Sequence, residues 1–294
     1  GLLGAGAEDH ALCLDEIRAE GEGERIAHGD DLMNDAGQGH GAHVKRLAAH
    51  DVEHLLPGYA GHAGIIIDSF CVREPAGVAA DGGNVYIKGI GNLTVDGGTI
   101  SGGLDNGVKN ATNGGNVYVE KGSLNLVSGT ISGGYASNAG GSVRVQGEGV
   151  LNISGGTLTG GYAKGNGGNV YSIGTIAITG GTVSDGAVAS EKIGGNIYAS
   201  GGSLSISDDP ALEGQPAITG GTATTGGNLA IKVNATVADC IISGGTATTG
   251  ANVYFEKADG VLTLSGLMET TVYVKSGSLD ITGLDPESDV KEDA

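Results

Sequence analysis

The sequence predicts an all-β protein whose main part is a parallel β-helix, a solenoid of about seven to eight coils with three strands each. Three observations predict it. Of the 294 residues 59 are glycine, a unit of about 27 residues recurs from residue 82 onward, and each unit holds short runs of alternating apolar and polar residues. Alternation at a period of two is typical of strands. A fixed period of this length is typical of solenoids, in which each unit buries its apolar face against its neighbours.

The repeat is marked by the pentapeptide Gly-Gly-Asn-Val-Tyr and close variants of it. The motif begins at residues 82, 114, 140, 167, 194, 226 and 250, and a truncated copy of the repeat lies at 271–283. Each full unit holds three short strand-like pieces, which in the second copy are 116–119, 124–126 and 130–132. If the copies stack, each strand pairs with its equivalent one coil on, about 4.8 Å away, and the coils form a rod about 35–40 Å long.

Two inward-facing columns follow from this alignment, because it brings apolar residues to the same two positions in successive copies. The first column is expected to hold Val85, Val117, Val143, Val170, Ile197, Leu229, Val253 and Val272. The second is expected to hold Ile100, Ile131, Leu158, Val183, Ile218 and Ile242. Residues stacked in this way form a core that is continuous through the coils.

Residues 1–81 and 284–294 lie outside the repeat. The first segment contains all seven His and four of the five Arg, with weak helical periodicity over 8–20 and 42–56 and a strand-like run at 64–72. Its fold is poorly defined by the sequence: a cap, a remnant of an upstream domain and a mis-framed region are alternative interpretations. The acidic residues 284–294 are expected to form a linker or tail.

Composition argues against several classes of protein and site. Five Pro and no Gly at every third position exclude collagen. A net charge of −19 argues against a nucleic-acid partner, because phosphates would be repelled. No apolar run reaches about 18 residues, so no membrane-spanning helix is expected. Three widely spaced Cys indicate neither a disulfide framework nor a metal-binding Cys pair, and no cofactor is expected.

Runs such as residues 92–103, together with the Gly-Gly-Asn-Val-Tyr words, resemble the right-handed β-helix repeats of bacterial surface and adhesin-like proteins, with a pectate-lyase-like architecture. The resemblance covers about 82–283. It implies an extracellular, wall-attached or secreted protein of which this chain is one segment. It also implies contact with a glycan or with a host or cell-surface protein.

An outward-facing tyrosine column is the first candidate site. It is expected to hold Tyr86, Tyr118, Tyr171, Tyr198 and Tyr254, interrupted by Arg144 and Ala230. Aromatic residues one coil apart stabilise a sheet by stacking, and this interpretation is favoured. An exposed row of this kind can also dock sugars or proteins, so these tyrosines and Arg144 are candidate binding residues. A neighbouring column of asparagines is expected to form a ladder of side-chain amides at the turns.

Catalysis on a polysaccharide is the alternative function. Glycoside hydrolysis needs two carboxylates at a fixed separation, and lyases of the resembling architecture use Asp-bound calcium with a basic residue. The repeats offer Asp96, Asp185, the pair Asp208-Asp209 and Arg144 on different units. Only their convergence in one groove would favour an enzyme. The favoured function is therefore a non-catalytic structural or adhesive solenoid.

A second weak candidate lies in the first segment. His50, Glu53 and His54 match the His-x-x-Glu-His pattern in which two His one helical turn apart bind zinc and the Glu activates water. A solvated helix face is the favoured interpretation of this short pattern, since no third ligand follows in a suitable context.

Overall fold

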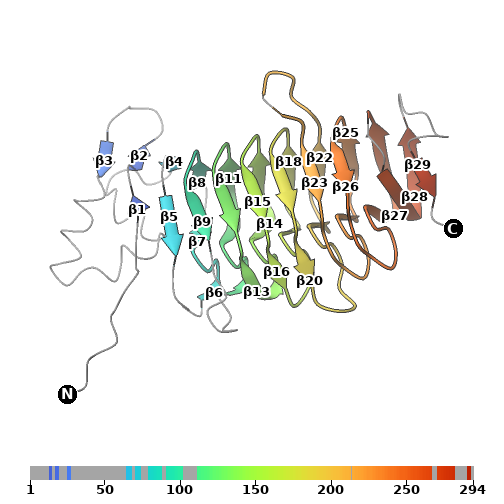
Figure 1. Ribbon diagram of the computed structural model, residues 1–294, viewed down its shortest axis with the longest axis horizontal. Helices are drawn as coiled ribbons and strands as arrows, with labels where there is room; N and C mark the ends of the chain where they lie inside the picture. The colour runs from blue at the N-terminus through green and yellow to red at the C-terminus, as the bar shows by residue number, and fades with distance from the viewer. Residues whose placement is uncertain are drawn as a thin grey trace, which may run out of the picture.

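The computed structural model describes residues 81–87, 91–101, 111–212, 214–266 and 270–281, together with the strand backbone at 13–14, 17–19, 25–27, 64–67, 70–73, 79–80 and 290–292. Figure 1 shows the coils stacked along the long axis of the molecule. The fold is the predicted all-β parallel solenoid, with about six turns where seven to eight were expected. The difference arises because every copy of the repeat was counted as a coil, although the last two copies, which form β27 (Val253–Ser265) and β28 (Thr270–Ile281), have no described strand on the third face.

The coil has a first and a second face that belong to one large sheet. The strands of the first face are β7 (Val85–Ile87), β17 (Val170–Ser172), β21 (Ile197–Ala199) and β24 (Leu229–Ile231). Those of the second face are β4 (Gly64–Ile67), β8 (Asn92–Val95), β18 (Thr175–Ile178), β22 (Ser203–Ile206) and β25 (Ala235–Ala238). Four longer strands run over both faces: β11 (Val117–Leu126), β14 (Val143–Ile153), β27 (Val253–Ser265) and β28 (Thr270–Ile281).

The third face is a separate parallel sheet, and the structure adds a short fourth strand that the three-strand repeat did not predict. The third face holds β5 (Phe70–Arg73), β9 (Thr99–Ser101), β12 (Thr130–Ser132), β15 (Thr157–Thr159), β19 (Thr182–Ser184), β23 (Ala217–Thr219) and β26 (Ile241–Ser243). The fourth holds β6 (Ala79–Asp81), β10 (Ala111–Asn113), β13 (Tyr135–Ala139), β16 (Tyr162–Ala163) and β20 (Ala187–Val188). These fourth strands are short and rich in alanine, so they lack a clear apolar alternation.

The two predicted inward columns are confirmed. Successive members of each column are partners in the parallel strand pairs. Every member is at most 5% exposed. The core therefore runs through the coils without a break, as the period-two pattern requires of strands buried on one face.

The two ends of the stack differ from its middle. At the N-terminal end, β1 (Cys13–Leu14) pairs antiparallel with β5, and β2 (Ile17–Ala19) pairs antiparallel with β4 and with β3 (Arg25–Ala27). The helix expected over 8–20 is thus wrong at β1 and β2, whereas the strand expected at 64–72 is present as β4 and β5. The possible helix over 42–56 lies outside the described residues.

At the C-terminal end the chain shortens its coil. Four residues separate the end of β27 from the start of β28, too few for strands on the third and fourth faces. The sheet of the third face accordingly ends at β26, whereas the first and second faces continue through β28. Strand β29 (Val290–Glu292) then pairs in parallel with the beginning of β28.

A buried ladder of asparagine amides connects the coils along the corner that precedes the first face. Asn169 donates to Asn196 at 2.8 Å, Asn196 to Asn228 at 2.8 Å, and Asn228 to Asn252 at 3.0 Å. The Asn169 amide also donates to the Ser184 carbonyl and accepts from the Gly161 amide. Each amide thereby joins two coils and the far end of the third face, which satisfies polar groups inside the core. The predicted ladder is confirmed.

Two glycines at this corner are imposed by the closeness of the coils. A Cβ on Gly141 would lie 2.0 Å from the carbonyl oxygen of Gly168, and a Cβ on Gly168 would lie 2.1 Å from that of Gly195. Both contacts are with backbone that is hydrogen-bonded into the stack, so neither atom is free to move away. The second glycine of the repeated pair is thus required by packing between coils.

We expect Gly168→Ala to lower the free energy of unfolding by about 3 kcal/mol, because the added methyl overlaps hydrogen-bonded backbone. Thermal unfolding followed by far-ultraviolet circular dichroism measures the change. The matched control is Gly147→Ala in β14, where a Cβ meets no atom within 4 Å. Equal stability of the two variants would contradict this account of the glycine pair.

The asparagine ladder has one gap, at Ser142. This residue is fully buried, and its Oγ has no hydrogen-bond partner. A Cβ built on Gly161 meets this Oγ at 2.6 Å, much as one built on Gly186 meets the amide nitrogen of Asn169 at 2.7 Å. The serine thus occupies the position of a ladder asparagine and makes none of its hydrogen bonds.

Ser142→Asn should therefore raise the free energy of unfolding by about 1 kcal/mol, since it restores a satisfied rung. Ser142→Ala is the control and should be neutral or slightly stabilising, because it removes an unpartnered buried hydroxyl. Chemical denaturation of both variants tests this. A loss of stability in Ser142→Asn would show that the gap is needed for packing.

Candidate functional site

The tyrosine column predicted from the sequence is present on the outer side of the first face. Parallel pairing places its members one coil apart, and the structure extends it by one residue to Tyr273. In order they are Tyr86, Tyr118, Arg144, Tyr171, Tyr198, Ala230, Tyr254 and Tyr273. The sequence feature that identifies Tyr273 is the Val-Tyr-Val motif of the truncated copy at 271–283.

The rings of this column are packed on one another. Tyr86 and Tyr118 stack with centroids 5.0 Å apart, and Tyr254 stacks on Tyr273 at 5.6 Å. The guanidinium carbon of Arg144 lies 3.9 Å from the ring centre of Tyr171, a cation–π contact that bridges the interruption. Tyr118 is only 7% exposed although its side chain points away from the core. Tyr118, Tyr198 and Tyr254 are buried, and the other rings of the column are partly buried.

Three of the tyrosine hydroxyls form a hydrogen bond with a side chain of the next coil. In each case this side chain lies two residues after the member of the column in that coil. Tyr86 donates to Glu120 at 2.9 Å, and Gln146 donates to the Tyr118 hydroxyl. Ser200 donates to the Tyr171 hydroxyl at 3.0 Å. Burial, followed by the hydrogen bond to Glu120, raises the pKa of Tyr86. The polar ends of these three rings are therefore engaged within the protein.

Arg144 is the one cationic member of the column. Burial lowers the pKa of its guanidinium, and its Nε has no hydrogen-bond partner. The contacts of the column support its stacking interpretation. Binding of a ligand by the six candidate residues stays a prediction.

A cluster of ion pairs lies on the first face near the C-terminal end of the stack. Glu256 accepts from Lys232 at 2.9 Å and from Lys275 at 2.7 Å, and Tyr254 donates to the same carboxylate at 3.0 Å. The hydrogen bonds from the two lysines hold the pKa of Glu256 at about 2. The cluster joins three successive coils, because these residues lie on β24, β27 and β28 or directly after them.

The acidic candidates for catalysis are not brought into one groove. Asp96 follows β8, whereas Asp208 and Asp209 follow β22 at the same corner, four strands away along the sheet. At about 4.8 Å per strand that separation is about 19 Å. Asp185 follows β19 at the far end of the third face. These carboxylates thus lie on separate turns, and Arg144 lies on the first face.

Within the described ranges, no group of three His, Cys, Asp or Glu side chains is placed to hold a metal ion. The motif residues His50, Glu53 and His54 lie outside these ranges. In the described residues there is also no helix of the length and apolarity needed to cross a membrane.

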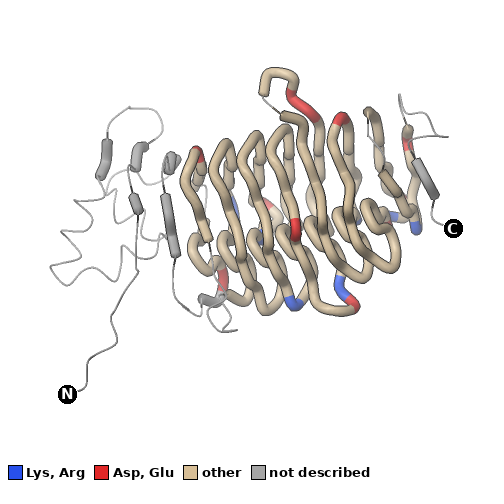
Figure 2. Tube along the Cα trace, viewed as in Figure 1, with Lys and Arg blue, Asp and Glu red and all other residues tan. Residues whose placement is uncertain are grey.

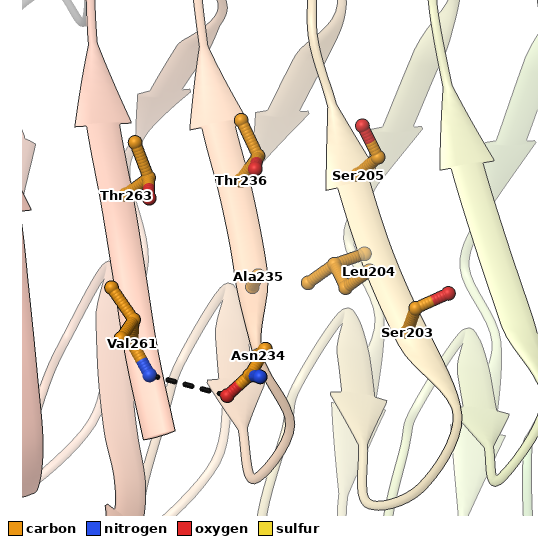
Figure 3. A pocket seen from close by; sticks show the side chains of 8 residues that line it. All are labelled: Ser203, Leu204, Ser205, Asn234, Ala235, Thr236, Val261 and Thr263. Carbon is orange, nitrogen blue, oxygen red and sulfur yellow. Dashed lines mark hydrogen bonds between the residues drawn. The ribbon is translucent and has the colours of Figure 1, made fainter. Parts of the chain in front are cut away.

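A groove on the second face was not predicted from the sequence. Figure 3 shows side chains from three successive coils along its walls. It has a volume of about 330 Å³ and is lined by Ser203, Leu204, Ser205, Asn234, Ala235, Thr236, Val261 and Thr263. Leu204 and Ala235 belong to the inward-facing positions of β22 and β25 and form its floor. The other side chains alternate with them and point outward.

The second face has an inward-facing column of its own, and the residue sizes in this column change at the groove. Parallel pairing aligns Leu204, Ala235 and Leu262, so alanine stands where both neighbouring coils have leucine. The side chain of Ala235 points into the core, so Ala235 contributes to the floor of the groove and not to its walls. The side-chain oxygen Oδ1 of Asn234 accepts from the Val261 backbone N–H at 3.2 Å and so connects neighbouring coils at the groove (Figure 3). A break in the size pattern of the column was the signal available.

The Glu256 cluster makes a pH prediction. Because its folded pKa lies below the unperturbed value of 4.5, the stabilisation is fully present above about pH 4.5 and is lost as the pH falls toward about 2. The melting temperature of wild type should exceed that of Glu256→Gln near neutral pH, and the difference should shrink over that window. Glu148→Gln is the control, since its 3.1 Å pair with Lys121 is exposed and contributes little. A difference independent of pH would contradict the prediction.

Comparison with protein-family models, with curated proteins and with solved structures returned no match for this chain. The resemblance to β-helix repeats of bacterial surface proteins therefore rests on the repeat pattern and on the solenoid fold. What the structure establishes is the solenoid, its side-chain ladders and the groove on its second face.

Proposed function

We propose that this chain is a rigid, non-catalytic structural segment of a cell-surface or secreted protein, which holds its two ends at a fixed separation and presents flat faces for contact. The observation that carries the proposal is the register of the first face. From Val85 to Val272 every coil pairs with the next at the same position. A stack that is hydrogen-bonded in this way has few means of bending.

The charge distribution supports a role in contact. Many of the charged residues lie at turns, as Figure 2 shows, and the coils between them are largely uncharged. Among the described strands, the third face carries no charged residue from β9 to β26, and the second face carries only Asp280 at its outward positions. Broad polar faces without charge suit contact with uncharged partners.

The alternative, a polysaccharide lyase or hydrolase, requires acid and base groups at one place. Asp96, Asp185 and Asp208 lie on separate turns, and no observation on the described residues gathers them around a bound sugar. The non-catalytic proposal is therefore the better supported of the two.

Rigidity is tested by pulsed electron spin resonance on the full chain with spin labels at Thr94→Cys and Asp280→Cys, after replacement of Cys13, Cys71 and Cys240 by alanine. These label sites lie in one outward column of the second face, seven strand spacings apart, and should give a narrow distance distribution centred near about 34 Å. Deletion of 143–196 joins equivalent positions and removes two coils, so the distance should fall by about 10 Å. A broad distribution, or an unchanged distance after the deletion, would contradict a rigid rod.

Catalysis is tested with the same protein. Incubation with neutral and acidic polysaccharides should release neither reducing ends nor unsaturated uronates above a heat-denatured control. Sustained release that is lost in Asp208→Asn or Asp96→Asn would overturn the non-catalytic proposal.

A further inference from the structure

We propose that the groove on the second face binds an uncharged polysaccharide chain lying along the solenoid axis; this names the partner of the contact surface and rests on the proposed function. The groove spans β22, β25 and β27, which are consecutive in the sheet. A ligand that fills it must therefore cross strands and run parallel to the stack. An extended polymer has that shape.

The walls of the groove offer hydrogen-bonding groups that the protein does not use. The hydroxyls of Ser205, Thr236 and Thr263 form no side-chain hydrogen bond in the described part of the chain. All three residues point outward, so their hydroxyls are accessible to a ligand. The Asn234 amide nitrogen is likewise free, since only the oxygen of this side chain is engaged. Hydroxyls and amides are the groups that pair with sugar hydroxyls, as both donors and acceptors.

The spacing of these groups is regular. Ser205 pairs with Thr236, and Thr236 with Thr263, so the three hydroxyls follow one another at intervals of about 4.8 Å. This interval is similar to the length of one sugar unit, so successive units meet equivalent groups. Val261, 40% exposed, adds an apolar patch at the wall against which the C–H face of a sugar ring can pack.

The charge of the surroundings selects against an acidic polymer. None of the eight lining residues is charged. The next coil continues the hydroxyl column with Asp280, which repels carboxylates. Lys232 and Lys275 are both engaged by Glu256 on the first face. A uronate or sulfate group would lose its hydration in the groove without gaining a cation, whereas the smaller desolvation cost of a neutral sugar can be offset by hydrogen bonds to the groove hydroxyls.

The test is affinity electrophoresis of the full chain through gels that contain hydroxyethyl cellulose, mixed-linkage β-glucan, galactomannan or polygalacturonate. We expect retardation by at least one of the three neutral polymers and none by polygalacturonate. The double variant Thr236→Val/Thr263→Val keeps the β-branched shape and removes two hydroxyls, so its dissociation constant should rise by about tenfold. The matched control Thr130→Val/Thr157→Val removes two neighbouring hydroxyls from the third face and should bind as wild type does.

Three outcomes would overturn the proposal: no retardation by any neutral polymer, equal retardation of the groove variant and wild type, or stronger retardation by polygalacturonate. Circular dichroism of both double variants verifies that the solenoid is intact. The spin-label distance is measured independently of any sugar. A narrow distance distribution without binding therefore overturns the groove proposal and leaves the rigid-segment proposal standing.

Discussion

The constraint on which the rest of the structure depends is the distance between coils, about 4.8 Å, set by backbone hydrogen bonds between parallel strands. In-register pairing at this distance places each side chain directly against its equivalent in the next coil. A residue type is therefore acceptable only if it packs or bonds well with a copy of itself. Valine and isoleucine do so inside, asparagine does so at the buried corner, and tyrosine does so outside.

The same constraint explains the large number of glycines. At the corner before the first face, two neighbouring coils approach so closely that the second glycine of each pair contacts the backbone of the next coil. Gly141 and Gly168 are examples. The first glycine of the pair has a different reason: Gly140 and Gly167 have φ near +70°, which side chains rarely adopt. Ala251 replaces the second glycine only before the shortened last coil.

Sequence periodicity predicted the parts of the fold in which each coil repeats the previous one. Both inward columns, the asparagine ladder and the tyrosine column follow from equivalent positions such as Val117 and Val143. The fourth strands were missed because pairs such as Tyr162–Ala163 are too short to show alternation. The helix expected over 8–20 failed at β1 and β2, where antiparallel pairing with the first coil outweighs a weak helical periodicity. The groove was missed because its walls are outward-facing residues, such as Asn234 and Val261, whose types change from coil to coil and so leave no repeated pattern.

The first and second faces differ in what they leave unsatisfied. On the first face, rings cover rings, hydroxyls such as that of Tyr86 meet polar partners, and Glu256 forms ion pairs with two lysines. A surface whose groups are already paired gains little from a ligand, because each new contact must replace an existing one. On the second face, hydroxyls such as that of Thr236 have no protein partner and line a hollow. The groups without a protein partner, and not the aromatic column, are therefore the basis of the binding surface that we propose, because a ligand there displaces only water.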